Sequence, residues 1–170
     1  MRTKSRHRPD SKRRRSRLPS RQPERWPLDA VAFSDVAEHL SAGYRRARQL
    51  IPEDWRAASA RDLHELRQCV VVHRYQMEIV EPLWPRLGRS WVREAQKLRN
   101  RLGKVQDLVV LSRYAEPHQP LAQWRSRLQS VASQRQAQHV AAAQRIAGRL
   151  FAEQPKAFRR RLEALWDRGQ

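Results

Sequence analysis

Two histidines and two arginines lie within one uninterrupted helical stretch, DLHELRQCVVVHRYQMEIV, residues 62–80. A helix turns about 100° per residue, so His64 and His73, nine positions apart, point in opposite directions. They therefore cannot bind one metal ion together or exchange a proton. The segment HELR also differs from the zinc-binding pattern HExxH, since position 68 holds Gln68 instead of a second histidine. The stretch alone predicts neither a metal site nor a catalytic histidine pair.

One face of this helix is apolar and predicts a contact with the core. Its side chains follow helical spacing: Leu63, Leu66, Val70, Met77 and Val80. His73 fills the gap in this stripe. We therefore expect a buried structural histidine that is satisfied by one hydrogen bond.

A second face mixes cations with a histidine and a phenol. It holds His64, Arg67, Val71, Arg74, Tyr75 and Glu78, all within about 100° of one another. Arginine, histidine and tyrosine side chains can donate hydrogen bonds to phosphate oxygens. Glu78, however, stands four residues after Arg74 and is placed to neutralise it. This helix alone fits a solvated basic face and an anion-binding surface equally well.

Cations also cluster on the neighbouring predicted helices. The first helix ends in YRRAR, residues 44–48, which includes Arg45 and Arg46. The third helix carries a polar stripe, with two further cations beside or after it: Arg89, Arg93, Lys97 and Asn100, then Arg101 and Lys104. If the three helices pack as neighbours, these cations line one groove. Such a groove suits a repeating polyanion better than a small metabolite.

The chain is strongly basic, with a formal net charge of +19 over 170 residues. Residues 1–27 carry 11 Lys and Arg against two acids, with almost no aliphatic side chains, and we expect a disordered basic tail. Residues 28–170 keep 25 Lys and Arg against 15 acids, so the folded domain is basic in its own right. A positive field of this kind attracts nucleic acid, anionic membrane surfaces or polyphosphate.

The only cysteine is Cys69, which excludes an intrachain disulfide and fits a reducing compartment. The first residues are too charged for a signal peptide. No stretch approaches the roughly 20 apolar residues of a spanning helix. These features predict a cytoplasmic protein without a membrane partner.

Strand signals are nearly absent, and the sequence predicts an all-α antiparallel bundle. The second helix is expected to begin near residue 60 and to end at Pro82 and Pro85. The other helices are expected at about 34–50, 88–102, 104–115, 121–152 and 156–167. Gly103 is placed to end the third helix as a C-terminal cap residue. Trp91, Trp124 and Val131 are expected on core-facing stripes.

Several segments resemble one family in the right order. GYRRARQL, LHELR, HRYQMEIVEPLWP and KLRNRLGKVQDLVVL are similar to the motifs of the CHAD domain, named for conserved histidines in an α-helical domain. The resemblance covers residues 36–115 well and the remainder more loosely. It implies a helical bundle with a basic surface that binds inorganic polyphosphate, can associate with polyphosphate granules and has no catalysis of its own.

The family pattern can be carried over to individual positions. His64 and Arg67 match its His-x-x-Arg, and the other matches are Arg45, Arg46, Tyr75 and Asp107. We expect Asp107 to pair with Arg67 or His64 and so to orient them. The chain departs from the pattern at Gln68, Val71 and Gln106, where the family usually places basic residues or histidine. Val71 places an apolar side chain in the middle of the binding face, where the family usually has a cation.

Full CHAD domains resemble two related bundles, and this chain is most similar to the second. The missing half motivates the hypothesis that two copies form a homodimer.

We therefore expect non-catalytic binding of polyphosphate or a similar polyanion, with no metal and no cofactor. The expected anion-binding residues are Arg45, Arg46, His64, Arg67, Arg74, Tyr75, Arg93, Lys97, Arg101 and Lys104. One alternative is a nucleic-acid or ribosome-associated protein that binds mainly through residues 1–27. Another is an enzyme acting on triphosphate or polyphosphate, which needs clustered carboxylates for Mg²⁺, whereas the acids here are spread singly.

Overall fold

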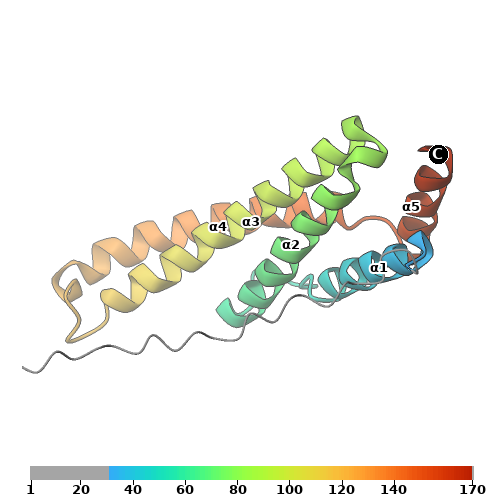
Figure 1. Ribbon diagram of the computed structural model, residues 1–170. Coiled ribbons are helices and arrows are strands. Elements are labelled where there is room, and N and C mark those ends of the chain that lie inside the picture. Colours follow the sequence, from blue (N-terminus) through green and yellow to red (C-terminus); the bar gives the residue numbers. More distant parts are fainter. Residues whose placement is uncertain (1–30, 170) are drawn as a thin grey trace, which may run out of the picture. The chain divides into compact units, whose positions relative to one another are not determined.

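The computed structural model describes residues 31–169, which form helices and turns without any strand (Figure 1). The all-α prediction is therefore confirmed. The α-helices are α1 (Phe33–Gln49), α2 (Ala60–Val80), α3 (Pro85–Tyr114), α4 (Arg125–Leu150) and α5 (Pro155–Gly169). Two 3-10 turns, η2 (Glu81–Leu83) and η3 (Ala122–Trp124), precede α3 and α4. The expected tail, residues 1–27, lies outside the described residues.

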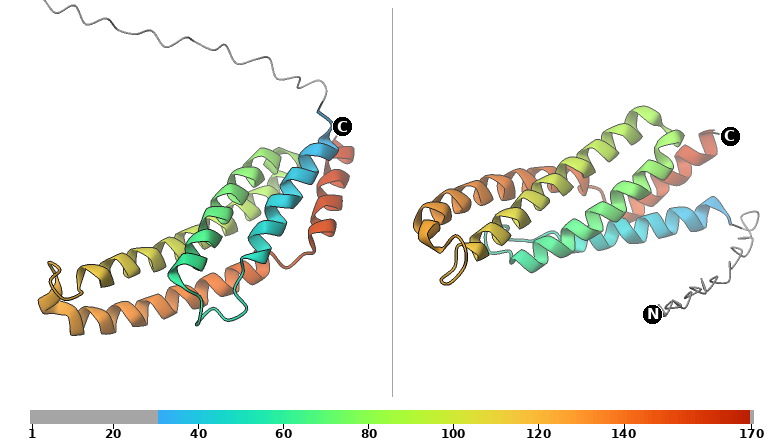
Figure 2. Two further views of the ribbon diagram at one scale, coloured as in Figure 1. Left: turned by 90° about the horizontal axis from the view of Figure 1, so that it is seen from below. Right: turned by 60° about the vertical axis from the view of Figure 1, so that its left-hand side comes forward.

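From α1 to α4, each helix runs antiparallel to the one before it, whereas α5 turns away from α4 at a steep angle (Figures 1 and 2). α2 packs between α1 and α3, while α3 also packs along α4 and α5 returns to α1. The turn-proximal halves of α3 and α4 extend beyond the other helices as a two-helix hairpin (Figure 2). None of the described helices is long and apolar enough to span a bilayer.

The core is built from the stripes that the sequence predicts. All five apolar residues expected on α2 are buried, together with Leu40, Tyr44 and Ala47 of α1 and Ala95, Leu98 and Leu102 of α3. Tyr44 stacks on Phe158 of α5 with ring centroids 4.3 Å apart, and Phe151 lies 5.2 Å from Tyr44. The Tyr44 hydroxyl donates to the Glu153 carbonyl at 3.0 Å. These contacts hold α5 and its connection to α4 against α1.

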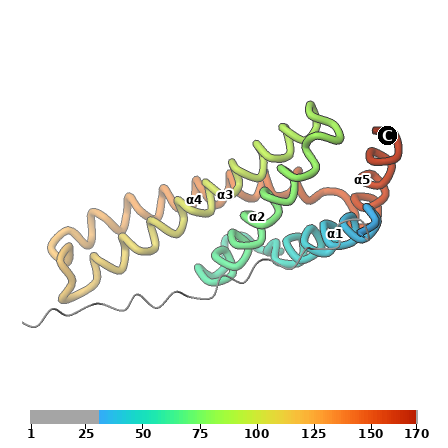
Figure 3. Tube along the Cα trace, in the orientation of Figure 1, coloured from blue at the N-terminus to red at the C-terminus, as the bar shows by residue number. Residues whose placement is uncertain are grey.

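The predicted break at Gly103 is wrong, because α3 runs from Pro85 to Tyr114 as one helix (Figure 3). No described glycine has the positive φ that a glycine helix cap adopts. Leu98, Leu102 and Val105 are all buried, so the apolar stripe stays in phase across Gly103. Burial of that stripe outweighs the roughly 1 kcal/mol that a glycine costs inside a helix.

The expected burial of Trp124 and Val131 is also wrong. Their side chains are 49% and 54% exposed. Both lie near the start of α4, in the part of the hairpin that extends beyond the other helices (Figure 1). Trp91 instead packs on the core as predicted, with its ring 6.0 Å from that of Phe158.

Replacing Gly103 by alanine is expected to stabilise the protein by about 0.5–1 kcal/mol. A Cβ there would meet only Arg67 Nε, at an ordinary 3.6 Å. Gly88→Ala is the matched comparison, because its Cβ would lie 2.6 Å from the Glu81 backbone. That change is expected to cost about 1–3 kcal/mol through overpacking. Chemical denaturation of both variants checks the pair, and destabilisation by Gly103→Ala would contradict the account.

Candidate anion-binding site

The cationic face of α2 turns towards α3. Arg67 lies against Gly103: a Cβ at position 103 would be 3.6 Å from Arg67 Nε. His64 and Arg74 follow at helical spacing on the same side of α2, with Val71 between them. We call His64, Arg67, Val71 and Arg74, together with Gly103, the α2–α3 seam.

Three nitrogen atoms of the seam are buried without a hydrogen-bond partner in the described part of the chain. They are His64 Nδ1, Arg67 Nε and Arg74 Nε. The Gln68 side-chain amide lies 3.0 Å from His64 Nε2. Since an amide nitrogen only donates, His64 Nε2 accepts and Nδ1 carries the proton. The seam therefore presents three desolvated donors, each costly to leave unpaired and each suited to a phosphate oxygen.

Arg74 has two neighbours on its own helix. Its Nη1 forms an ion pair with Glu78, as the spacing predicts. Its Cζ lies 4.0 Å above the centre of the Tyr75 ring, and Tyr75 is 55% exposed. The stacking and the ion pair hold the guanidinium in place, while Glu78 removes part of its charge.

The arginine pair of α1 does not reach the seam. α1 meets α2 where Gly43 lies against Gln76: a Cβ at position 43 would be 2.7 Å from the Gln76 amide oxygen. Gln76 is nine residues from Arg67 and so faces about 180° away from it. Arg45 and Arg46 are exposed on α1, and the structure does not join them with His64 and Arg67 in one groove.

Two of the α3 cations lie towards α4. Lys97 Nζ is 2.7 Å from Glu94 Oε1, and Arg149 of α4 binds the other oxygen of Glu94 at 3.2 Å. Arg101 Nη1 lies 3.3 Å from His139 Nδ1 of α4. Arg93 and Lys104 are exposed on α3. The structure thus divides the expected binding residues among separate surfaces.

Asp107 does not orient the seam, contrary to the prediction. It forms an ion pair with Lys104 at 3.6 Å, and its side chain is 69% exposed. Lys104 is three residues away on the same helix, so the pair satisfies Asp107 locally. The i,i+3 spacing of Lys104 and Asp107 was the sequence signal for this pair.

His73 is buried, as predicted, but residues 31–169 do not supply the predicted hydrogen bond. Its side chain is 2% exposed and packs between the rings of Tyr44, Phe151 and Phe158. Nδ1 has no partner among the described residues. Burial lowers the pKa of His73 to about 4, so it packs as a neutral ring and stays outside the seam.

The depressed pKa of His73 predicts a loss of stability in mild acid. The unfolded chain protonates this histidine below its ordinary pKa of 6.5, whereas the folded protein resists protonation down to about 4. The free energy of unfolding should therefore be unaffected above pH 6.5 and fall by about 3 kcal/mol between pH 6.5 and 4. Urea denaturation against pH measures this, with His73→Leu as the control that lacks the slope. Equal slopes in both proteins would contradict it.

Two residues of α4 complete a basic cluster that sequence reasoning missed. Arg135 and His139, one turn apart, join Arg101 and Lys104 of α3. Burial is the largest cause that lowers the pKa of His139, and the charges of Arg101, Lys104 and Arg135 lower it further. The composition of α4 was the sequence feature that could have revealed this cluster, because the helix contains five arginines and no acid.

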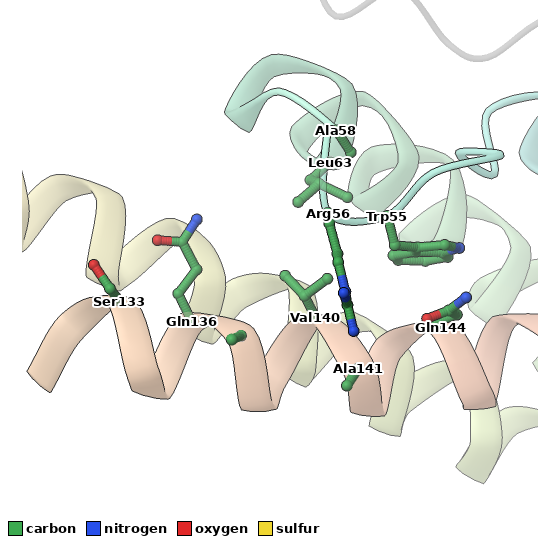
Figure 4. A pocket seen from close by; sticks show the side chains of 10 residues that line it. Trp55, Arg56, Ala58, Leu63, Ser133, Gln136, Val140, Ala141 and Gln144 are labelled. Carbon is green, nitrogen blue, oxygen red and sulfur yellow. The ribbon is translucent and has the colours of Figure 1, made fainter. Parts of the chain in front are cut away.

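A cavity of about 480 Å³ lies elsewhere, between α4 and the connection from α1 to α2. Figure 4 shows Trp55 and Arg56 reaching from that connection towards α4. Arg56 is the one cation among its lining residues, so this cavity lacks the convergent charges of the seam. Within residues 31–169, no three metal-binding side chains gather around one point.

Comparison with known proteins adds one finding. A family model described as the CHAD domain matches residues 4–116, which include α1, α2 and α3. No curated protein and no solved structure matches the chain significantly.

Proposed function

Because the chain belongs to the CHAD domain family, we propose that it binds inorganic polyphosphate, without transforming it, through the α2–α3 seam. The family is associated with polyphosphate binding in general. The observation that carries the proposal for this chain is the set of three buried, unpartnered donors on His64, Arg67 and Arg74. Phosphate oxygens supply acceptors for all three.

The charge around the seam favours a long ligand over a single phosphate. α3 and α4 together carry thirteen Lys and Arg against two acids. A polyphosphate chain that leaves the seam over α3 meets the exposed Arg93 and Lys104. Such binding releases counterions and weakens steeply as salt rises.

The remaining expectations follow from this proposal. Residues 28–170 form the binding domain, and residues 1–27 add a second, unspecific contact for polyanions, including nucleic acid. The protein acts in the cytoplasm, where it associates with polyphosphate granules, and it needs no metal or cofactor.

Two copies pair as a homodimer. Apolar side chains exposed on the α3–α4 hairpin support the pairing: Val110, Tyr114, Trp124 and Val131. Sedimentation equilibrium measures it, and a monomer at every workable concentration would refute it.

Removing residues 1–27 separates the proposal from its main alternative, a nucleic-acid-binding protein that acts through that segment. We expect the shortened chain to retain polyphosphate binding with a shallower dependence on salt, since the deletion removes 11 Lys and Arg. Calorimetric titration at several salt concentrations measures both quantities. The alternative would be supported if removal of residues 1–27 abolished polyphosphate binding while seam variants of the full chain bound polyphosphate normally.

A further inference from the structure

Helices α3 and α4 carry cations that their own acids do not neutralise. The two acids of these helices are Glu94 and Asp107. Glu94 bridges Lys97 and Arg149, one carboxylate oxygen to each. Asp107 is largely exposed, and its ion pair among the described residues is with Lys104, at 3.6 Å. The other cations of α3 and α4 have no acidic partner on these two helices.

Four side chains meet about two turns along α3 from Glu94. Arg101 Nη1 donates towards His139 Nδ1 at 3.3 Å, so His139 accepts there and carries its proton on Nε2. Arg135 lies one turn before His139 on α4, and its Nη1 donates to Gln138 at 3.3 Å. Lys104 lies one turn after Arg101 on α3. Arg101 therefore contacts the imidazole of His139, and Lys104 and Arg135 lie near enough for their charges to lower its pKa.

We propose that Arg101, Lys104, Arg135 and His139 form a second anion-binding site, which binds the phosphoryl oxygens of a polyphosphate chain and takes up a proton in doing so. We call these four residues the α3–α4 cluster. The proposal rests on the proposed function only for the identity of the ligand. The cluster itself stands on its own geometry.

The carboxylate of Glu94 shows how cations of α3 and α4 converge on one oxyanion. Its two oxygens bring together a cation of α3 and a cation of α4. The α3–α4 cluster repeats this arrangement, with Arg101 on α3 and Arg135 on α4, but no carboxylate of residues 31–169 bridges them. A phosphoryl group has the charge and the oxygens to take that place.

The cluster and the seam lie on different sides of α3. Arg101 faces α4, whereas Gly103, two residues later and about 200° around the helix, faces Arg67 of α2. The exposed surface between them carries Arg93, Lys97 and Lys104. A polyphosphate chain that crosses α3 can therefore occupy both sites, whereas a single phosphate can occupy only one.

Proton uptake follows from the charges that face His139. These are Arg101, Lys104 and its partner Asp107 from α3, and Arg135 from α4. Burial and the three cations lower the pKa of His139 in the free protein. A bound phosphoryl group adds negative charge and reverses the effect of the cations. Binding must then strengthen as the pH falls, by up to about one log unit per pH unit for one proton.

The test uses the full chain and tripolyphosphate, with each histidine followed by nuclear magnetic resonance against pH. We expect saturating tripolyphosphate to raise the pKa of His139. Arg135→Gln should reduce this rise and weaken binding about fivefold. Arg145→Gln, an equal reduction of charge at an exposed position on α4, should change neither. His139→Gln should bind with a shallower dependence on pH than the wild type.

The outcomes separate this inference from the proposed function. An unchanged His139 titration, with binding abolished in Arg67→Gln, would overturn the α3–α4 cluster and leave the seam standing. A raised pKa of His139 that persists in Arg67→Gln would support the cluster as an independent site. Absence of tripolyphosphate binding by the full chain at low salt would overturn both.

Discussion

Arg67→Gln combined with Arg74→Gln is expected to weaken polyphosphate binding about 100-fold at low salt. Each guanidinium has a buried Nε without a partner in the described part of the chain, and each can donate charge-assisted hydrogen bonds to phosphate oxygens. Such a hydrogen bond contributes about 1.5 kcal/mol, or roughly tenfold in affinity. The log–log dependence on salt should also become shallower, by about 0.7 for each phosphate that the variant no longer neutralises. Calorimetric titration with polyphosphate measures both effects.

Arg45→Gln combined with Arg46→Gln is the matched control. It removes the same charge from exposed positions on α1, away from the seam. Its affinity should fall only by the small general effect of net charge. Equal weakening in the two double variants would show that net charge alone governs binding and that the seam has no special role. Circular dichroism and thermal melts establish that both variants fold.

Phe158→Ala should cause the largest loss of stability, about 3–5 kcal/mol. Phe158 is 1% exposed, stacks on Tyr44 and lies 6.0 Å from His73 and Trp91. Its removal leaves a cavity where α5 meets the rest of the bundle. Urea denaturation measures the loss of stability.

Ile79→Ala provides the comparison for Phe158→Ala. Ile79 is 70% exposed on α2, and its truncation should change the free energy of unfolding by no more than about 0.5 kcal/mol. If both variants were destabilised equally, the aromatic cluster around Tyr44 would not be the centre of the core.

The sequence predicts α1 and α2 well because their apolar residues recur at strict helical spacing. The α2 stripe with His73 in its gap is buried as expected. Gly103 misled the prediction, since a local preference for ending a helix is weaker than burial on both sides of it. Trp124 and Val131 misled it because periodicity gives the direction of a side chain but not the presence of a neighbour to cover it.

The candidate site was predictable on one helix and not across helices. The composition of the α2 face follows from spacing alone, and the structure turns that face towards α3. Helix order along the chain does not reveal on which side of α2 each neighbour packs, so Arg45 could not be separated from Arg67. The same limit concealed the meeting of Arg101 with His139, which are 38 residues apart.

Competition between polyphosphate and RNA for the full chain tests the central claim most directly. A fluorescent RNA with the same total charge as the polyphosphate is first bound to the protein, and polyphosphate is then added at fixed salt to displace it. The assay compares the wild type with the Arg67→Gln, Arg74→Gln double variant. The account predicts that polyphosphate displaces RNA from the wild type well below equal charge concentration, and that the double change removes this preference. Equal competition by the two polyanions, or a preference that survives the double change, would contradict it.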